Sequence, residues 1–242
     1  MYNLHLWNSP EWGRSGELVI SVYNEVYNRG EALDELWRRA EREIETNMLE
    51  FVMASHDTKD HDLEQLFSKN YFREWFCVIG MVYSGDRMAD SGLESRLYIK
   101  DDFDAYHRAM GDAFETMRKE IDVRPHNIFE NRSPERMEIL QKQMENLVEN
   151  TYLFFQDGTW VGSAMIKGNE IDEVFVVPSQ KGRGYGRKIL NDCVNRVLEK
   201  GNGEVFLKVV DWNKTAMDLY KQSGFREYVK MRYLRKIIKE QS

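Results

Sequence analysis

The feature that most constrains this chain is a glycine-rich segment, residues 178–187, that separates a predicted strand from a predicted helix. Before it lies the short β-branched run 174–177. After it, apolar residues recur at helical spacing: Ile189, Leu190, Cys193, Val194, Val197 and Leu198. A helix N-terminus presents free N–H groups and a positive dipole end, and glycine lets the backbone approach a bulky phosphate. The segment therefore predicts a strand–loop–helix unit that binds a pyrophosphate.

The spacing of the glycines excludes two common phosphate-binding loops. A P-loop requires Gly, four residues and then Gly-Lys-Ser/Thr, and no such run follows Gly182. The dinucleotide-binding fingerprint G-x-G-x-x-G also fails, because Gly182 and Gly184 are followed by Arg187 where the third glycine is required.

The remaining pattern resembles the Q/R-x-x-G-x-G/A loop with which GCN5-related N-acetyltransferases (GNAT) hold the pyrophosphate of acetyl-CoA. The resemblance implies a cofactor-binding segment in which Lys stands where the family has Gln or Arg. Its residues here are Lys181, Gly182, Arg183, Gly184, Tyr185 and Gly186, followed by the cation Arg187.

A second motif lies downstream, at the same order and spacing as in that family. The strand-like run 205–210 precedes Asn213, and a helical segment then carries Tyr220 and ends at Gly224. The resemblance implies that Asn213 bridges two splayed strands and that Tyr220 lies near the cofactor sulfur and protonates the departing thiolate. A phenol, with a pKa of roughly 10, is a protonated donor at neutral pH.

The predicted strand 170–177 carries three carboxylates that could include the catalytic base. Strand alternation places Glu170 and Asp172 on one face and Glu173 on the other. In similar enzymes the acidic residue falls at positions that match Glu170 or Asp172, so these two are the candidates for deprotonating the amine, directly or through water. The resemblance also implies that the pantetheine arm of acetyl-CoA pairs with the backbone of the residues that follow: Phe175, Val176 and Val177.

The resemblance further implies an α/β (α+β) fold, with a mixed central sheet flanked by helices. It implies an N-acetyltransferase that moves the acetyl group of acetyl-CoA directly to a primary amine of a small molecule. Two alternatives remain open at this point: a protein acetyltransferase acting on an N-terminal or lysine amine, and a nonenzymatic CoA-binding protein. The partners expected are acetyl-CoA and an amine acceptor, in a monomer or weak dimer.

Comparing the sequence with itself suggests a repeat. A shift of 153 positions aligns Phe67 with Tyr220, Asp60 with Asn213 and the strand-like run 18–23 with 171–176. The sequence therefore predicts a degenerate partial GNAT-like domain at residues 1–90 and a catalytic domain at 91–242, joined near the polar stretch 84–92. Phe67 has no hydroxyl, and Glu31 aligns with Gly184, where a carboxylate would repel phosphate. The first domain is therefore not expected to be a second active site.

Composition narrows the class of protein. The 34 Lys and Arg against 41 Asp and Glu give a net charge of −7, which disfavours nucleic-acid partners. Two cysteines without metal-ligand spacing, no apolar leader and no membrane-length segment favour a cytoplasmic protein. His56 and His61, each followed by Asp, lie on different predicted elements, so no metal site is expected.

Overall fold

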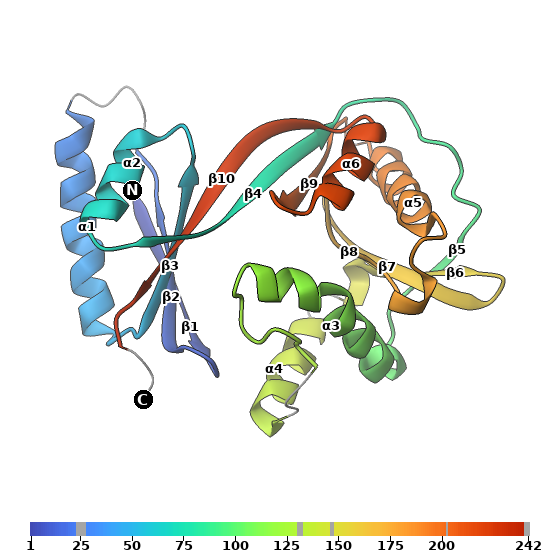
Figure 1. Cartoon of the computed structure of the whole chain (residues 1–242), viewed down its shortest axis with the longest axis horizontal. Helices are drawn as coiled ribbons and strands as arrows, with labels where there is room; N and C mark the ends of the chain where they lie inside the picture. The colour runs from blue at the N-terminus through green and yellow to red at the C-terminus, as the bar shows by residue number, and fades with distance from the viewer. Residues whose placement is uncertain (23–27, 130–132, 146–147, 202, 240–242) are drawn as a thin grey trace. The chain divides into compact units, whose positions relative to one another are not determined.

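The computed structural model of the chain describes residues 1–22, 28–129, 133–145, 148–201 and 203–239 (Figure 1). The chain forms two compact units. The first unit contains Met1–Val78 together with Val229–Ser242, and the second contains Ile79–Tyr228.

The second unit is a mixed sheet flanked by helices, as predicted. Its strands are hydrogen-bonded in the order β4-β9-β8-β7-β6-β5. Strands β5 to β8 pair antiparallel, whereas β8 and β9 pair parallel. The elements that lie wholly within this unit are β5 (Glu94–Leu97), α3 (Phe103–Glu120), α4 (Pro134–Glu145), β6 (Thr151–Gln156), β7 (Thr159–Lys167), β8 (Glu170–Val176), α5 (Tyr185–Glu199), β9 (Val205–Val210) and α6 (Lys214–Gln222).

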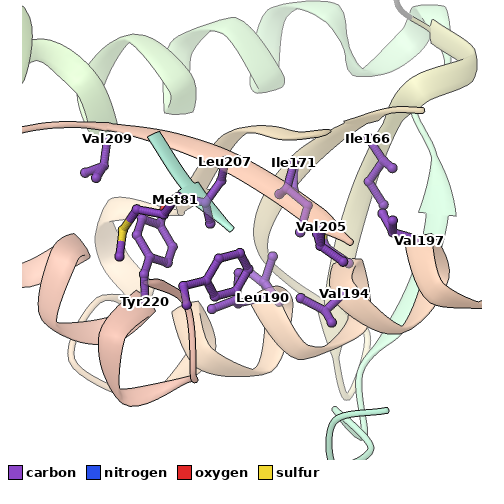
Figure 2. Close-up of a cluster of buried hydrophobic side chains, with 14 of the residues drawn as sticks. Met81, Ile166, Ile171, Leu190, Val194, Val197, Val205, Leu207, Val209 and Tyr220 are labelled. Atoms are coloured by element: carbon purple, nitrogen blue, oxygen red, sulfur yellow. The ribbon is translucent and has the colours of Figure 1, made fainter. Parts of the chain in front are cut away.

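Two apolar clusters cover the two faces of this sheet. Neighbouring residues of β6 show the division, since Phe154 belongs to the cluster under α5 and α6 whereas Leu153 belongs to the cluster under α3 and α4. Figure 2 shows the first cluster, to which α5 contributes the buried Leu190, Val194 and Val197. The predicted apolar face of this helix is confirmed.

Local sequence explains several boundaries in the second unit. The hairpin between β6 and β7 turns at Asp157 and Gly158, whose φ angles of 51° and 72° suit a type I′ turn. Helix α4 begins at Pro134 and is capped by the Ser133 hydroxyl, which accepts from the Arg136 N–H at 3.2 Å.

The first unit has one sheet with two helices on the same face (Figure 1). Its strands follow the order β1-β2-β3-β10-β4. Its elements are β1 (Tyr2–Ser9), β2 (Gly13–Ile20), α1 (Arg29–Thr46), β3 (Phe51–Asp57), α2 (His61–Lys69), β4 (Arg73–Tyr83) and β10 (Arg226–Ile237). The strand expected at 18–23 ends at Ile20, and Tyr23 lies outside the described residues. Strand β1 was not predicted.

Strand β10 returns to complete the first unit, and strand β4 continues from the first unit into the second. Residues Met231–Ile237 of β10 pair antiparallel with β3 in the first unit. In the second unit the neighbour of β9 is β4, from which Ile79 and Met81 enter the buried cluster. No single boundary therefore separates the two units, in contrast to the division predicted at residue 90.

The order of elements is the same in two parts of the chain. The series β1-β2-α1-β3-α2-β4 has the same sequence of strands and helices as β7-β8-α5-β9-α6-β10. In both series the first two strands pair antiparallel and the next pair is parallel. The bounds of α2 and α6 differ by the 153 positions of the sequence repeat.

Candidate active site

The glycine-rich loop connects β8 to α5 and has the backbone that the sequence motif requires. Gly182 and Gly184 have φ angles of +79° and +80°, a left-handed conformation that side chains disfavour. A Cβ at either glycine would meet no protein atom within 4 Å, so the loop faces open space. Gly184 is the N-cap of α5, and the N-terminal N–H groups of this helix are therefore available to an anion.

The charges around this loop favour an anion. The first turn of α5 contains no acidic residue. Lys181 and Arg183 are exposed, and among the described residues neither side chain has a hydrogen-bond or ion-pair partner. Arg187 is also exposed and donates to the Gln222 side chain of α6 at 2.8 Å. The loop therefore combines free cations with a helix N-terminus, as a pyrophosphate site requires.

Close packing joins the loop to β8 and α6. A Cβ on Gly186 would lie 3.5 Å from Leu219 Cδ2 and 3.8 Å from Val176 Cγ2. Tyr185 and Gly186 are only half-buried, so the first turn of α5 reaches both elements without being covered by them. The structure thus brings the first motif, the end of β8 and the helix of the second motif together.

Strands β8 and β9 pair only at their beginnings. In the described part of the chain, Glu170 pairs with Phe206 and Ile171 with Leu207, although β8 continues to Val176 and β9 to Val210. The β9-facing edge of β8 beyond Ile171 therefore has no strand partner. The other edge of β8 is held close to β7, where a Cβ on Gly162 would lie 2.4 Å from the Phe175 carbonyl oxygen.

Strand β8 is interrupted at Glu173. Its register with β7 shifts between the pair Ser163–Phe175 and the pair Met165–Asp172, and Glu173 has a positive φ of 49°. Side chains beyond this irregularity therefore do not alternate regularly between the two faces of the sheet, as the prediction for Glu170, Asp172 and Glu173 had assumed. Positive φ at a non-glycine residue is uncommon and carries backbone strain, which recurs at functional sites.

The irregular strand places the Glu173 carboxyl group among the side chains of α3. The Tyr106 hydroxyl donates to Glu173 Oε2 at 3.3 Å. Burial, together with the negative charge of Asp172, raises the pKa of Glu173 above its usual value. A carboxylate with a raised pKa is a stronger base, so Glu173 is better suited to accept a proton than a carboxylate of ordinary pKa.

The two carboxylates expected to supply the base are in different surroundings. Glu170 forms an ion pair with Lys208 of β9 at 2.7 Å. Asp172 is exposed, and its Oδ1 accepts from the Glu173 backbone N–H at 2.8 Å. Strand alternation predicts Glu173 on the face opposite Glu170 and Asp172. The surroundings of its side chain depend on the bulge in β8, which is set by pairing with β7.

Tyr220 lies on α6 among buried apolar side chains of the second unit (Figure 2). It is 8% exposed, and burial raises its pKa to about 12. The phenol is therefore fully protonated at neutral pH. The charge of Asp172 contributes to this rise, which places the two groups in the same electrostatic environment.

Asn213 caps the helix that carries Tyr220. Its side-chain Oδ1 accepts from the Ala216 N–H at 3.2 Å. This hydrogen bond fixes the start of α6, and with it the position of Tyr220 two turns later. The bridging of two strands that the resemblance implied is not among the described hydrogen bonds of this side chain.

The aromatic side chains of α3 pack as part of the core. Tyr106 is 1% exposed, and Phe103 and Phe114 pack against the same cluster. The Tyr106 ring contacts Phe175 of β8, with ring centroids 5.7 Å apart. Helix α3 is therefore fixed to the strand that carries Glu173.

The remaining reactive groups are not arranged for covalent or metal chemistry. Burial raises the pKa of the Cys193 thiol, and Cys77 is buried as well, so neither is a reactive thiolate. Within the described residues, no group of three or more His, Cys, Asp or Glu side chains is placed to hold a metal ion. No described helix is long and apolar enough to cross a lipid bilayer.

Comparison with solved structures defines the fold. The whole chain superposes on a GCN5-related N-acetyltransferase from Sphaerobacter thermophilus with a TM-score of 0.70, covering 78% of that chain at 19% identity. It also superposes on a tandem GNAT protein from the clavulanic acid biosynthesis pathway with a TM-score of 0.59, covering 85% of that chain at 12% identity. The fold is that of the GNAT proteins.

Comparison with family models then identifies the region that carries the site. Residues 114–225 match the acetyltransferase (GNAT) family, and this range contains Glu173, the glycine-rich loop and Tyr220. This part of the chain is therefore similar to the GNAT acetyltransferases in sequence as well as in fold.

Curated relatives match shorter segments. The thialysine N-epsilon-acetyltransferase of Bos taurus is 36% identical over 74 residues, which are 31% of this chain and 41% of that protein. The L-ornithine N5-acetyltransferase of Arabidopsis thaliana is 24% identical over 102 residues, which are 42% of this chain and 44% of that protein. The chain thus spans less than half the length of these relatives.

Proposed function

We propose that this protein is an N-acetyltransferase that moves the acetyl group of acetyl-CoA directly to a primary amine of a small molecule. The observation that carries the proposal is the loop at the N-terminus of α5. Its open left-handed glycines and two unpaired cations lie next to the end of β8, whose β9-facing edge has no strand partner. The loop fits a pyrophosphate and the edge fits the amide-containing pantetheine arm.

In the proposed reaction Glu173 is the base. An amine reaches the enzyme protonated and must lose a proton before its nitrogen attacks the thioester carbonyl. Glu173 accepts that proton, directly or through water, as the C–N bond forms and the C–S bond breaks. The raised pKa of Glu173 supports this role better than the paired Glu170 or the exposed Asp172. Holding both reactants at one site supplies much of the rate.

Tyr220 is proposed to act on the departing sulfur. A thiol has a pKa of roughly 8.5, several units below the pKa of about 12 of Tyr220. Complete transfer of the phenolic proton to the thiolate is therefore unfavourable. Donation of a hydrogen bond to the sulfur as negative charge develops on it is the role that this difference favours.

The names of the relatives support a small acceptor. Two of them are described as acetyltransferases of thialysine and of L-ornithine. An acidic chain and a half-buried carboxylate at the site suit a cationic amine. Acetylation of a protein amine would use the same chemistry at the same site. A CoA-binding protein without activity would use only the glycine-rich loop. Measuring transfer to different amines distinguishes these two alternatives from a small-molecule acetyltransferase.

We infer in addition that the first unit is a degenerate copy without an active site of its own. The repeated order of elements and the matching bounds of α2 and α6 support the common origin. Phe67 in α2 takes the position of Tyr220, and Glu31 lies in the first turn of α1, where it would oppose a phosphate. One acetyl-CoA per chain is expected.

The test measures thiol release from acetyl-CoA with a panel of amines. The panel contains amino acids with a side-chain amine, polyamines and a lysine-containing peptide, and mass spectrometry identifies the acetylated product. Acetylation of small amines supports the proposal, whereas a preference for the peptide favours the protein acceptor. Binding of acetyl-CoA, measured by calorimetry, without transfer to any amine would support the nonenzymatic alternative.

A further inference from the structure

The outermost strand of the first unit, β1, has an open hydrogen-bonding edge. The sheet order begins with β1, and in the described part of the chain no strand pairs with its outer side. Leu6 is 49% exposed and Trp7 is 38% exposed. The strand therefore presents both polar backbone groups and apolar side chains to solvent.

The pairing of β1 with β2 shows which backbone groups face outward. Met1 and Ser21 exchange two hydrogen bonds, of 2.7 and 2.8 Å, so they form a hydrogen-bonded pair. In an antiparallel ladder such pairs alternate with non-hydrogen-bonded pairs. The N–H and C=O groups of the odd-numbered residues of β1 consequently face β2. Those of the even-numbered residues face outward: Tyr2, Leu4, Leu6 and Asn8.

Strand β1 lacks the features that normally protect an exposed edge. Its eight residues contain no Lys, Arg, Asp, Glu or Pro, and its register with β2 is continuous from Tyr2 to Ser9 without a bulge. The outermost strand of the second unit differs in each respect. Strand β5 has four residues, of which Glu94 and Arg96 are charged, and Arg96 is paired with Asp102.

We propose that β1 pairs antiparallel with β1 of a second copy of this chain. A second copy fits because the edge is self-complementary: the strand brings no charge against itself, and each outward N–H meets an outward C=O. The register that uses all four outward residues places Leu4 opposite Leu6 of the other copy and Tyr2 opposite Asn8. His5 then lies opposite His5 of the other copy at the twofold axis, as a non-hydrogen-bonded pair.

This register can be tested by cross-linking. In a non-hydrogen-bonded pair the Cα atoms are about 4.5 Å apart, within the range that a disulfide spans. The variant His5→Cys should therefore form a covalent dimer under mild oxidation. The variant Asn3→Cys is the matched control, because its copies would lie roughly 14 Å apart in this register. The two native cysteines are buried and should not interfere.

A second measurement tests the pairing without a cysteine. Sedimentation of the unmodified protein should show a weak monomer–dimer equilibrium. Leu6→Pro removes an outward N–H that the β1–β2 ladder does not use, so it should leave the melting temperature nearly unchanged and weaken the dimer about 10- to 100-fold. Leu6→Val keeps the N–H and should preserve the dimer.

The outcomes are distinct. Rapid cross-linking of His5→Cys but not of Asn3→Cys, with a dimer that Leu6→Pro weakens, supports the proposal. A protein that remains monomeric at millimolar concentration, or equal cross-linking of the two cysteine variants, overturns it. A dimer that Leu6→Pro leaves intact would show that another surface is used.

Discussion

The Tyr106 hydroxyl on α3 donates a hydrogen bond of 3.3 Å to the Glu173 carboxylate on β8. Tyr106 is held by the rings of Tyr98 and Phe175, with centroids 5.3 and 5.7 Å away, and is almost fully buried. Glu173 lies where β8 departs from regular pairing. The fold thus fixes a carboxylate of raised pKa and supplies one donor that stabilises its ionised form.

The first prediction concerns the pH dependence that this hydrogen bond sets. Tyr106→Phe removes a donor that stabilises the ionised carboxylate, so the pKa of Glu173 should rise further above its usual value. In the proposed mechanism Glu173 acts as the ionised base, so the acid limb of kcat/KM should move to higher pH. Tyr98→Phe is the control, since Tyr98 packs on Tyr106 without a described bond to Glu173. Equal shifts in the two variants would contradict the assignment.

The second prediction assigns the base among three carboxylates. Glu173→Gln should lower kcat at neutral pH by about 10²–10⁴-fold and remove the acid limb of the pH profile. Affinity for acetyl-CoA should persist. Glu170→Gln should have a small effect, because that side chain pairs with Lys208 at the start of the strand. A full loss in Asp172→Asn with little change in Glu173→Gln would move the base to Asp172.

Local sequence locates the loop and the two helices of this site but not the direction of every side chain in it. The glycine-rich loop and the Asn213–Tyr220 spacing depend on residues next to one another in the chain, so their elements could be located from sequence. Glu173 could not, because its direction depends on a bulge set by pairing with β7. The return of β10 to the first unit could not be predicted for the same reason, since it depends on pairing between distant segments.

The third prediction tests the phosphate loop with a control for backbone strain. Gly184 and Gly201 have φ angles of +80° and +82°, and a Cβ at either meets no protein atom within 4 Å. Alanine at either position should destabilise the protein by a similar amount, about 1–2 kcal/mol. Only Gly184→Ala should reduce the stabilisation by acetyl-CoA, which is about 2.7 kcal/mol at 100 times Kd. Undiminished thermal stabilisation of Gly184→Ala would argue against pyrophosphate at this loop.

The fourth prediction concerns Tyr220. Tyr220→Phe removes one hydroxyl and little volume, so the binding of acetyl-CoA should be retained. The loss of a hydrogen bond to the developing thiolate should lower kcat, by about 10²-fold if chemistry limits turnover. Single-turnover measurements establish which step is limiting. An unchanged rate of the chemical step would remove Tyr220 from the mechanism.

The last prediction follows from the strands that complete each unit. Strand β4 supplies Ile79 and Met81 to the buried cluster of the second unit, and Tyr83 packs on Phe225 with ring centroids 5.4 Å apart (Figure 2 shows Met81). Burying a large apolar side chain contributes about 1.5–3 kcal/mol, against a total stability of about 5–15 kcal/mol. A fragment that begins at residue 91 should therefore not fold cooperatively.

The matched control is a fragment of residues 79–242, which differs from the fragment 91–242 only by residues 79–90. It retains the β4 side chains of the second unit and should show a cooperative melting transition that acetyl-CoA raises. The shorter fragment should show neither the transition nor the response to ligand. Equal stability of the two fragments would mean that the β4 residues are dispensable for the stability of the second unit.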